Sequence, residues 1–193
     1  MEKNKISSSF KVVIIGGSAG SLEVLMKVLP RLNRISTFAL VIVLHRKNSE
    51  DSTLEELIAL KTTIPVKEVE DKTAFLPGFI YVAPSDYHLL FESHNQLSLD
   101  TSEKVNYSRP SIDVSFESAA EVYGPLLTGI LLSGANSDGT HGLQVIKQQS
   151  GTVVIQHPDS AEMPYMPRVA LENNSPDFVL NVEELLGYIN SIE

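Results

Sequence analysis

The stretch Lys11–Leu29, KVVIIGGSAGSLEVLMKVL, decides the fold of this chain. It opens with the β-branched run Val12–Ile15, which is too short for a helix and predicts a buried strand. The small residues Gly16–Gly20 follow, and apolar side chains then recur at helical spacing as far as Leu29. A strand, a glycine turn and a helix in this order present the residue at the apex of the turn to solvent. That residue is Ser18, the centre of a G-x-S-x-G sequence typical of a nucleophile elbow.

Two other interpretations of this turn compete with the nucleophile elbow. A phosphate-binding loop uses the same unit, but a dinucleotide fingerprint that starts at Gly16 would need glycines where the chain has Ser18 and Ser21. The Gly-Lys-Ser/Thr of a Walker loop occurs nowhere in the chain. The remaining interpretation is a purely structural turn. A serine becomes a nucleophile only beside a base, so the rest of the chain must decide.

Composition excludes several classes of function. The formal net charge of −9 argues against nucleic acid as a partner, because a phosphate backbone would be repelled. The chain has no cysteine, which excludes disulfides, thiolate catalysis and thiolate metal sites. Its longest apolar run, Phe38–Leu44, is far shorter than the ~20 residues of a membrane span. We therefore expect a soluble, cytoplasmic protein without membrane insertion, metal or cofactor.

Buried strands alternate with amphipathic helices along the chain. Phe38–Leu44 and Leu126–Leu132 are apolar runs of strand length, and Ser111 is positioned to cap a helix over Ile112–Tyr123. This alternation predicts an α/β fold, a doubly wound and mostly parallel sheet with helices on both faces. The segment Tyr87–Asp100 is more polar and predicts an antiparallel hairpin at one edge of the sheet.

Ligands of such sheets bind outside the carboxyl ends of the strands, so the residues that follow the strands are the candidates. Ser18, His45, Asp138 and His157 hold these positions. Serine, histidine and aspartate together suit acyl transfer, in which the hydroxyl attacks a carbonyl, the imidazole carries the proton and the carboxylate orients the imidazole. Two triads fit, Ser18–Asp138–His157 and Ser18–His45–Asp138, and chain order cannot choose between them.

Backbone N–H groups near Ser18 and around Ala135 and Asn136 are candidate donors to an oxyanion. Asp138 also has a structural interpretation, because Asp-Gly forms turns and an aspartate can cap the following helix.

Three further histidines complete the candidates. His88 and His141 lie near predicted strand ends or loops and are candidates to line a pocket, whereas His94 falls in the hairpin loop and predicts plain surface. No local histidine spacing typical of a zinc site is present.

Six blocks of sequence, in order, resemble the catalytic domain of the chemotaxis protein-glutamate methylesterases, the CheB family. They are IIGGSAGS, VLHR, LPGFIYVAPSDYHLL, YSRPSIDVSFESAA, LLSGANSDGTHGL and MPYMPRVAL. The resemblance runs from about residue 10 to residue 193, so we expect residues 1–9 to be a flexible leader and 10–193 to be one methylesterase-like catalytic domain. It implies the doubly wound fold and hydrolysis of glutamate γ-methyl esters on methylated chemoreceptors, with release of methanol. Some members also deamidate receptor glutamines.

The resemblance places the family serine on Ser18, its histidine on His45 and its aspartate on Asp138, which favours the first histidine over His157. It places His88 close to the active site. Two positions depart from well-known members, where threonine is common at Ala19 and methionine at Ala135. With Asn136, these residues are the expected oxyanion or substrate pocket.

A further departure concerns regulation. Typical chemotaxis esterases carry a phosphoaccepting receiver domain before the catalytic one, whereas about ten residues precede the first strand here. We therefore expect a stand-alone form, not controlled through a receiver domain on this chain. The alternative is a catalytically silent module of the same fold that binds a receptor or sensor kinase.

Overall fold

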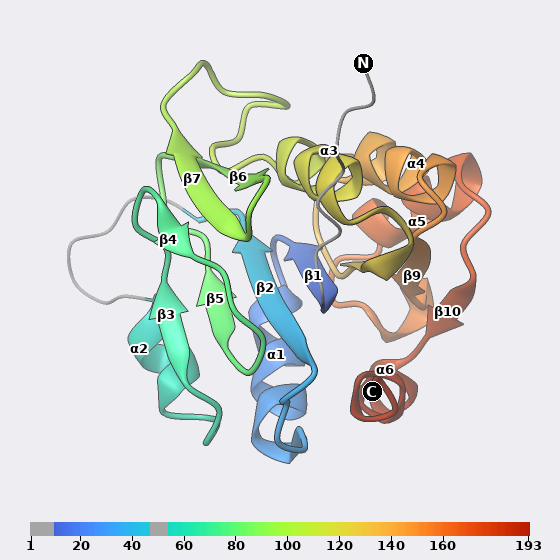
Figure 1. Cartoon of the computed structure of the whole chain (residues 1–193). Coiled ribbons are helices and arrows are strands. Elements are labelled where there is room, and N and C mark those ends of the chain that lie inside the picture. The colour runs from blue at the N-terminus through green and yellow to red at the C-terminus, as the bar shows by residue number, and fades with distance from the viewer. Residues whose placement is uncertain (1–9, 47–53) are drawn as a thin grey trace.

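The computed structural model describes residues 10–46 and 54–193, which contain two sheets. The larger has seven strands in the order β10-β9-β8-β1-β2-β5-β3, all paired in parallel (Figure 1). Its strands are β1 (Lys11–Gly17), β2 (Phe38–Leu44), β3 (Val66–Glu68), β5 (Ile80–Val82), β8 (Leu127–Leu131), β9 (Thr152–Gln156) and β10 (Phe178–Leu180). The parallel sheet predicted from the sequence is confirmed.

Helices cover both faces of this sheet, as predicted. Figure 1 shows α3, α4 and α5 on one face and α1, α2 and α6 on the other. They are α1 (Ser21–Val28), α2 (Leu54–Ala59), α3 (Ile112–Tyr123), α4 (Thr140–Gln148), α5 (Tyr165–Asn173) and α6 (Val182–Asn190). Short 3-10 turns at Leu29–Arg31, Gly124–Leu126 and Pro158–Ser160 complete the helical segments.

The strands are apolar throughout because each contributes to two cores. In β1, Val12 and Ile14 point into the core beneath α3 and α4, and Val13 and Ile15 point into the core beneath α1 and α6. Alternate residues of a strand face opposite sides, so a strand covered on both sides needs no polar position. This is why the sequence shows continuous apolar runs instead of alternation.

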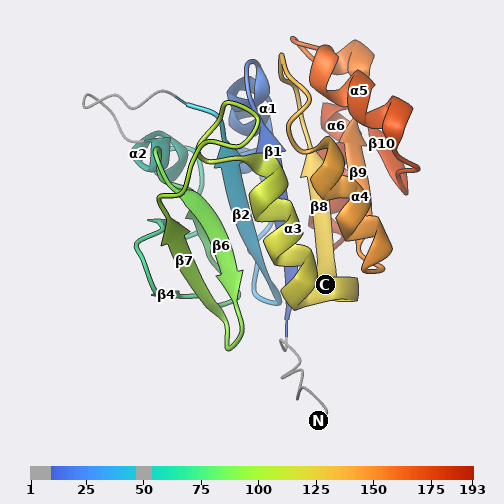
Figure 2. The ribbon, with the colours of Figure 1, turned by 90° about the horizontal axis from the view of Figure 1, so that it is seen from above.

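The predicted hairpin forms, but it does not lie at an edge of the main sheet. Strands β6 (His88–Glu92) and β7 (Gln96–Asp100) pair antiparallel, and β4 (Thr73–Ala74) joins β7 to make a separate three-stranded sheet. Figure 2 shows this sheet beside α3. Leu89 and Phe91 of β6 are buried in the core that α3 covers, and β3 takes the place next to β5. Burial against the helix therefore decides the position of the hairpin.

The predicted leader, residues 1–9, falls outside the described residues. Among the residues that the structure describes, no helix is long and apolar enough to cross a bilayer.

Candidate active site

The candidate site lies where the order of the main sheet reverses. Strand β1 is central, with β2 on one side and β8 on the other, and crevices form outside the carboxyl ends at such switch points. Gly17 pairs with Leu44 in the parallel register, and the His45 amide donates to the Gly17 carbonyl at 3.1 Å. Ser18 and His45 therefore occupy the next positions on neighbouring strands. On the other side, the Ser18 amide donates to the carbonyl of Ser133 at 2.9 Å.

The turn that carries Ser18 is fixed by its own neighbours. Gly20 has φ 82°, in the left-handed region, and a Cβ there would lie 2.6 Å from the Ser133 hydroxyl oxygen, so the position requires glycine. The Ser21 hydroxyl and amide both donate to the Ser18 carbonyl. Ser133 donates in turn to the carbonyl of Ala19 at 2.7 Å. The serine thus sits on a tight strand-to-helix connection held from both sides.

Asp138 is fully buried and accepts hydrogen bonds from the start of α3. Its Oδ2 accepts from the Ile112 amide at 2.7 Å and from His45 Nε2 at 2.7 Å. Its Oδ1 accepts from the Asp113 amide at 3.1 Å and the Ser111 hydroxyl at 3.0 Å. A helix N-terminus offers unpaired N–H groups and a favourable dipole to a carboxylate. Burial acts to raise the pKa of Asp138, but the hydrogen bonds it accepts, first from His45, hold that pKa below its usual value.

The hydrogen bonds of His45 assign different roles to its ring nitrogens. Since Nε2 contacts a carboxylate, it carries the proton and donates to Asp138, which leaves Nδ1 as an acceptor. The Asn136 side-chain amide lies 3.4 Å from Nδ1. The Ser18 hydroxyl makes no hydrogen bond to this ring within the described residues, and bonds of this kind often tighten only with substrate in place. The acceptor nitrogen of the partly buried imidazole thus lies beside Asn136, on the residue whose backbone is level with Ser18 on the neighbouring strand.

Sequence reasoning missed a second carboxylate in this network. The Asn106 side-chain amide donates at 2.8 Å to both Asp138 Oδ1 and Asp113 Oδ2. The other oxygen of Asp113 accepts from the Gly142 amide at 2.7 Å, in the first turn of α4. Burial raises the pKa of the Asp113 carboxyl, and the nearby charge of Asp138 raises it further. The available signal was an acidic residue three positions before the core residue Phe116, on the inward flank of a helix.

Two backbone amides that belong to exposed residues border the site. The amides of Ser18 and Gly134 donate to carbonyls of the protein, whereas those of Ala19 and Ala135 have no acceptor in the described part of the chain. The residue after the nucleophile supplies an oxyanion donor in hydrolases built on a nucleophile elbow. Ala19 and Ala135 are both exposed, so the methyl groups of these alanines are not part of the buried core.

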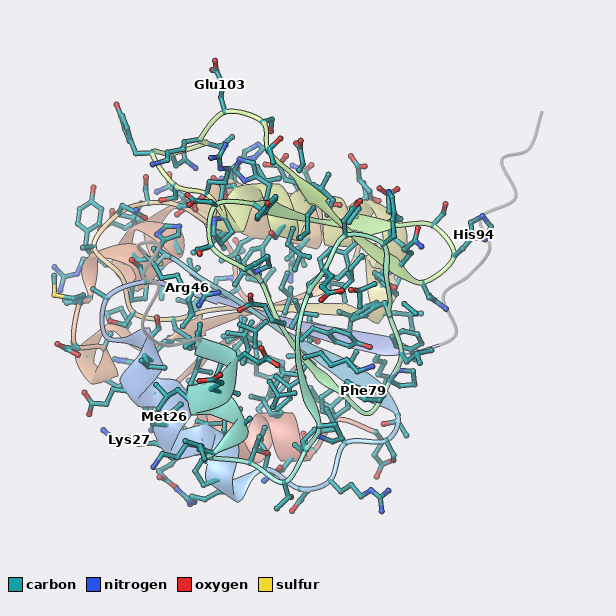
Figure 3. The ribbon with its side chains drawn as sticks, turned by 90° about the vertical axis from the view of Figure 1, so that its left-hand side faces the viewer. Met26, Lys27, Arg46, Phe79, His94 and Glu103 are labelled. Atoms are coloured by element: carbon teal, nitrogen blue, oxygen red, sulfur yellow. The ribbon has the colours of Figure 1, made fainter. Side chains whose placement is uncertain are left out.

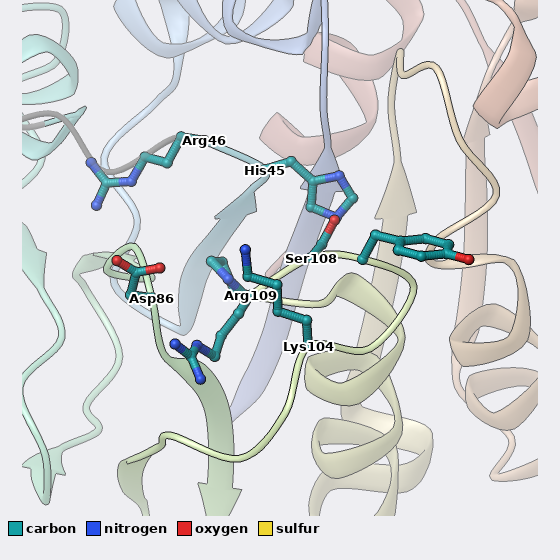
Figure 4. A pocket seen from close by; sticks show the side chains of 8 residues that line it. His45, Arg46, Asp86, Lys104, Ser108 and Arg109 are labelled. Atoms are coloured by element: carbon teal, nitrogen blue, oxygen red, sulfur yellow. The ribbon is translucent and has the colours of Figure 1, made fainter.

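A pocket of about 450 Å³ opens beside His45 (Figure 4). It is lined by His45, Arg46, Asp86, Lys104, Tyr107, Ser108, Arg109 and Pro110. His88, which the sequence also suggested for the pocket, is instead fully buried beneath the loop that forms one wall. Its Nε2 donates to the Glu103 carbonyl at 2.9 Å, and its Nδ1 accepts from the Ser111 amide at 3.2 Å. His88 therefore ties this loop to the cap of α3.

The remaining histidines lie elsewhere. His157 follows β9, which β8 separates from β1, and its Nδ1 accepts from the amide of Asp159, so it is not the histidine bonded to Asp138. His141 is exposed and lies 2.8 Å from Glu117. Figure 3 shows His94 at the surface, at the tip of the hairpin and distant from Arg46. Across residues 10–46 and 54–193, no group of three or more His, Asp or Glu side chains is arranged to hold a metal.

A doubly wound sheet whose carboxyl edge carries a serine on a strand-to-helix turn and a hydrogen-bonded histidine–aspartate pair is typical of serine hydrolases. The model of the CheB methylesterase family matches residues 13–189, and the chain belongs to that family.

Individual relatives agree with this assignment. A protein of Leptospira interrogans is 42% identical over 177 residues, which cover 92% of both chains. The Thermotoga maritima protein-glutamate methylesterase/protein-glutamine glutaminase is 32% identical over 179 residues, 91% of this chain and 52% of that relative. The crystal structure of the T. maritima CheB methylesterase catalytic domain superposes with a TM-score of 0.89 at 30% identity, and covers 95% of this chain and 98% of that domain.

Proposed function

We propose that this chain is a protein-glutamate methylesterase that hydrolyses glutamate γ-methyl esters on a methylated chemoreceptor or a similar signalling protein, in the cytoplasm. The observation that carries the proposal is the 2.7 Å hydrogen bond between Asp138 and His45, the residue level with Ser18 on the neighbouring strand. The buried carboxylate fixes the imidazole in the tautomer whose free nitrogen accepts a proton. Membership of the CheB methylesterase family supplies the reaction class.

The proposed reaction proceeds through an acyl-enzyme. The Ser18 hydroxyl attacks the γ-carbonyl carbon of the ester and its proton passes to His45 Nδ1, while the amides of Ala19 and Ala135 stabilise the oxyanion. The imidazolium then protonates the leaving methoxide, and methanol departs. Water, deprotonated by the same nitrogen, attacks the acyl-enzyme and releases glutamate and free Ser18. Asp138 stays ionised throughout, because its hydrogen-bond donors favour the charged form.

The same site can also be considered for the hydrolysis of a glutamine side chain. The same acyl-enzyme would form from a glutamine side chain with ammonia as the leaving group, and the T. maritima relative is named for both activities. We extend the proposal to glutamine deamidation on this ground. No step calls for a metal or cofactor.

The test is methanol release from a methyl-labelled chemoreceptor cytoplasmic domain. Wild-type protein should release methanol, and Ser18→Ala should abolish release while it leaves the fold intact by circular dichroism. Methanol release that survives Ser18→Ala would refute the proposed nucleophile. A serine-directed phosphonate separates the enzyme from a catalytically silent receptor-binding module: stoichiometric labelling of Ser18 supports the enzyme, and absence of both labelling and methanol supports the module.

A further inference from the structure

The pocket beside His45 carries positive charge on a negatively charged protein. The chain has a formal net charge of −9, yet the pocket lining contains three cations, Arg46, Lys104 and Arg109, and one carboxylate, Asp86. The γ-methyl ester that the proposed reaction consumes is neutral. The ester group itself therefore offers these cations no anionic partner in the bound substrate.

The three cations differ in how far the protein itself engages them. Arg46 contacts Glu68 at 3.1 Å. Arg109 donates from Nη1 to the carbonyls of Thr101 and Ser102, both at 2.9 Å, and so braces the loop that bears Lys104. These two arginines form a wall whose position the fold sets.

Lys104 is the cation left for a ligand. Its side chain is exposed and, within residues 10–46 and 54–193, has neither an ion pair nor a hydrogen bond. Figure 4 shows it reaching into the space between Asp86 and His45. An ammonium group beside guanidinium donors recognises a carboxylate.

We propose that Lys104, supported by Arg46 and Arg109, forms a subsite for the carboxylate of an acidic side chain that neighbours the scissile ester in the protein substrate. This inference rests on the proposed function. On a helical substrate, residues three or four positions apart lie about 5–6 Å from each other at their Cβ atoms, so a neighbouring glutamate faces the enzyme together with the ester. The subsite then selects esters set among acidic residues, although the enzyme as a whole is acidic.

The test compares two helical peptides that carry one glutamate γ-methyl ester and differ only at the positions three and four residues away, glutamate in one and alanine in the other. The readout is the ratio of their kcat/KM values for methanol release. Wild type should favour the acidic peptide by about fivefold at low salt, the scale of one partly exposed ion pair, and the ratio should fall toward one in 0.5 M KCl. Lys104→Glu should bring the ratio below one, and Lys104→Gln should bring it close to one.

The matched control is Lys11→Glu, an equal change of charge at an exposed lysine at the amino end of β1, opposite the site. It should keep the wild-type ratio. An unchanged ratio in Lys104→Glu, or the same fall in both variants, would overturn the subsite.

A binding measurement separates this inference from the proposed reaction. Fluorescence anisotropy with Ser18→Ala protein and the same labelled peptides needs no turnover. Preferential binding of the acidic peptide that Lys104→Glu removes, without methanol release by wild type, would refute the esterase and keep the subsite. Methanol release without a charge-dependent preference would refute the subsite alone.

Discussion

Replacing Asn106 by glycine should destabilise the protein and slow hydrolysis, although Asn106 touches no substrate in the proposed reaction. Asn106 supplies one donor group to two buried carboxylates, Asp113 and Asp138, at 2.8 Å each. Hydrogen bonds to charged groups contribute about 1.5–3 kcal/mol each. Asn106 itself is exposed, so water can replace part of the loss, and we expect a net cost of about 2–3 kcal/mol. For a domain of this size that lowers Tm by about 5–10 °C.

Glycine is the appropriate substitution because Asn106 has φ 52°, a left-handed conformation in which alanine would add strain. Tyr107, the next residue of the same turn, has φ 62° and is 98% exposed, so Tyr107→Gly is a matched control for the flexibility that glycine adds. Thermal denaturation at pH 7 should separate the two variants by most of the predicted shift. The kcat/KM of Asn106→Gly for methanol release should fall about tenfold to hundredfold, because Asp138 loses orientation.

Asn106→Asp sharpens the same prediction. It keeps the size of the side chain and places a third carboxylate beside Asp113 and Asp138, so its destabilisation at pH 7 should exceed that of Asn106→Gly. The excess should shrink as pH falls toward about 4, because the Asp113 carboxyl, whose pKa burial raises, takes up a proton before Asp138 does. Equal Tm values for Asn106→Gly and Tyr107→Gly, together with an Asn106→Asp variant as stable as wild type, would refute the shared-donor network.

Three more outcomes follow from the site. Ser133→Ala should cost about 1–3 kcal/mol in urea denaturation, because the Ala19 carbonyl and the Met163 amide lose their buried partner, and it should lower kcat. Gly20→Ala should cost at least as much, since its φ of 82° disfavours a side chain; an unchanged urea midpoint would contradict this. The depressed pKa of Asp138 means that its ionised form stabilises the fold above the unfolded pKa of about 3.9, and that this stability is lost as pH falls through the folded value. Asp138→Asn should lack this acid dependence in urea titrations from pH 7 to pH 3, and should lower kcat about 10⁴-fold at pH 7.

The fold was predictable because its strands are unambiguous. A run such as Phe38–Leu44 is buried along its whole length, and the cap at Ser111 fixed the helix Ile112–Tyr123 to the residue. The hairpin forms as predicted, but the prediction that it lies at an edge of the main sheet was wrong. Local alternation specifies the pairing between two strands and not the surface against which they pack. That surface is α3, and its packing is a tertiary property.

The candidate site likewise contains residues that the sequence predicts and others that it does not. Ser18, His45 and Asp138 follow strong strands, so the rule of the carboxyl edge selects them as candidates, and the hydrogen bond from His45 to Asp138 favours the triad with His45 over the one with His157. The roles of these residues in catalysis stay predictions. Asn106 lies on a turn between Val105 and Ser108. No local sequence pattern predicts that its side chain donates a hydrogen bond to the buried Asp138.

The hydrogen bonds from the first turn of α3 to Asp138 make the thermal stability of the site depend on that of the core. The buried face of α3 packs into the larger hydrophobic cluster. The Asp138 carboxylate is hydrogen-bonded to the first turn of this helix, so its position is as rigid as that of the core. Heat inactivation should therefore coincide with global unfolding instead of preceding it. Substitutions in α3 that shift the backbone of Ile112 and Asp113 should therefore change the position of the Asp138 carboxylate and the rate of hydrolysis, even when no residue in contact with the ester is altered.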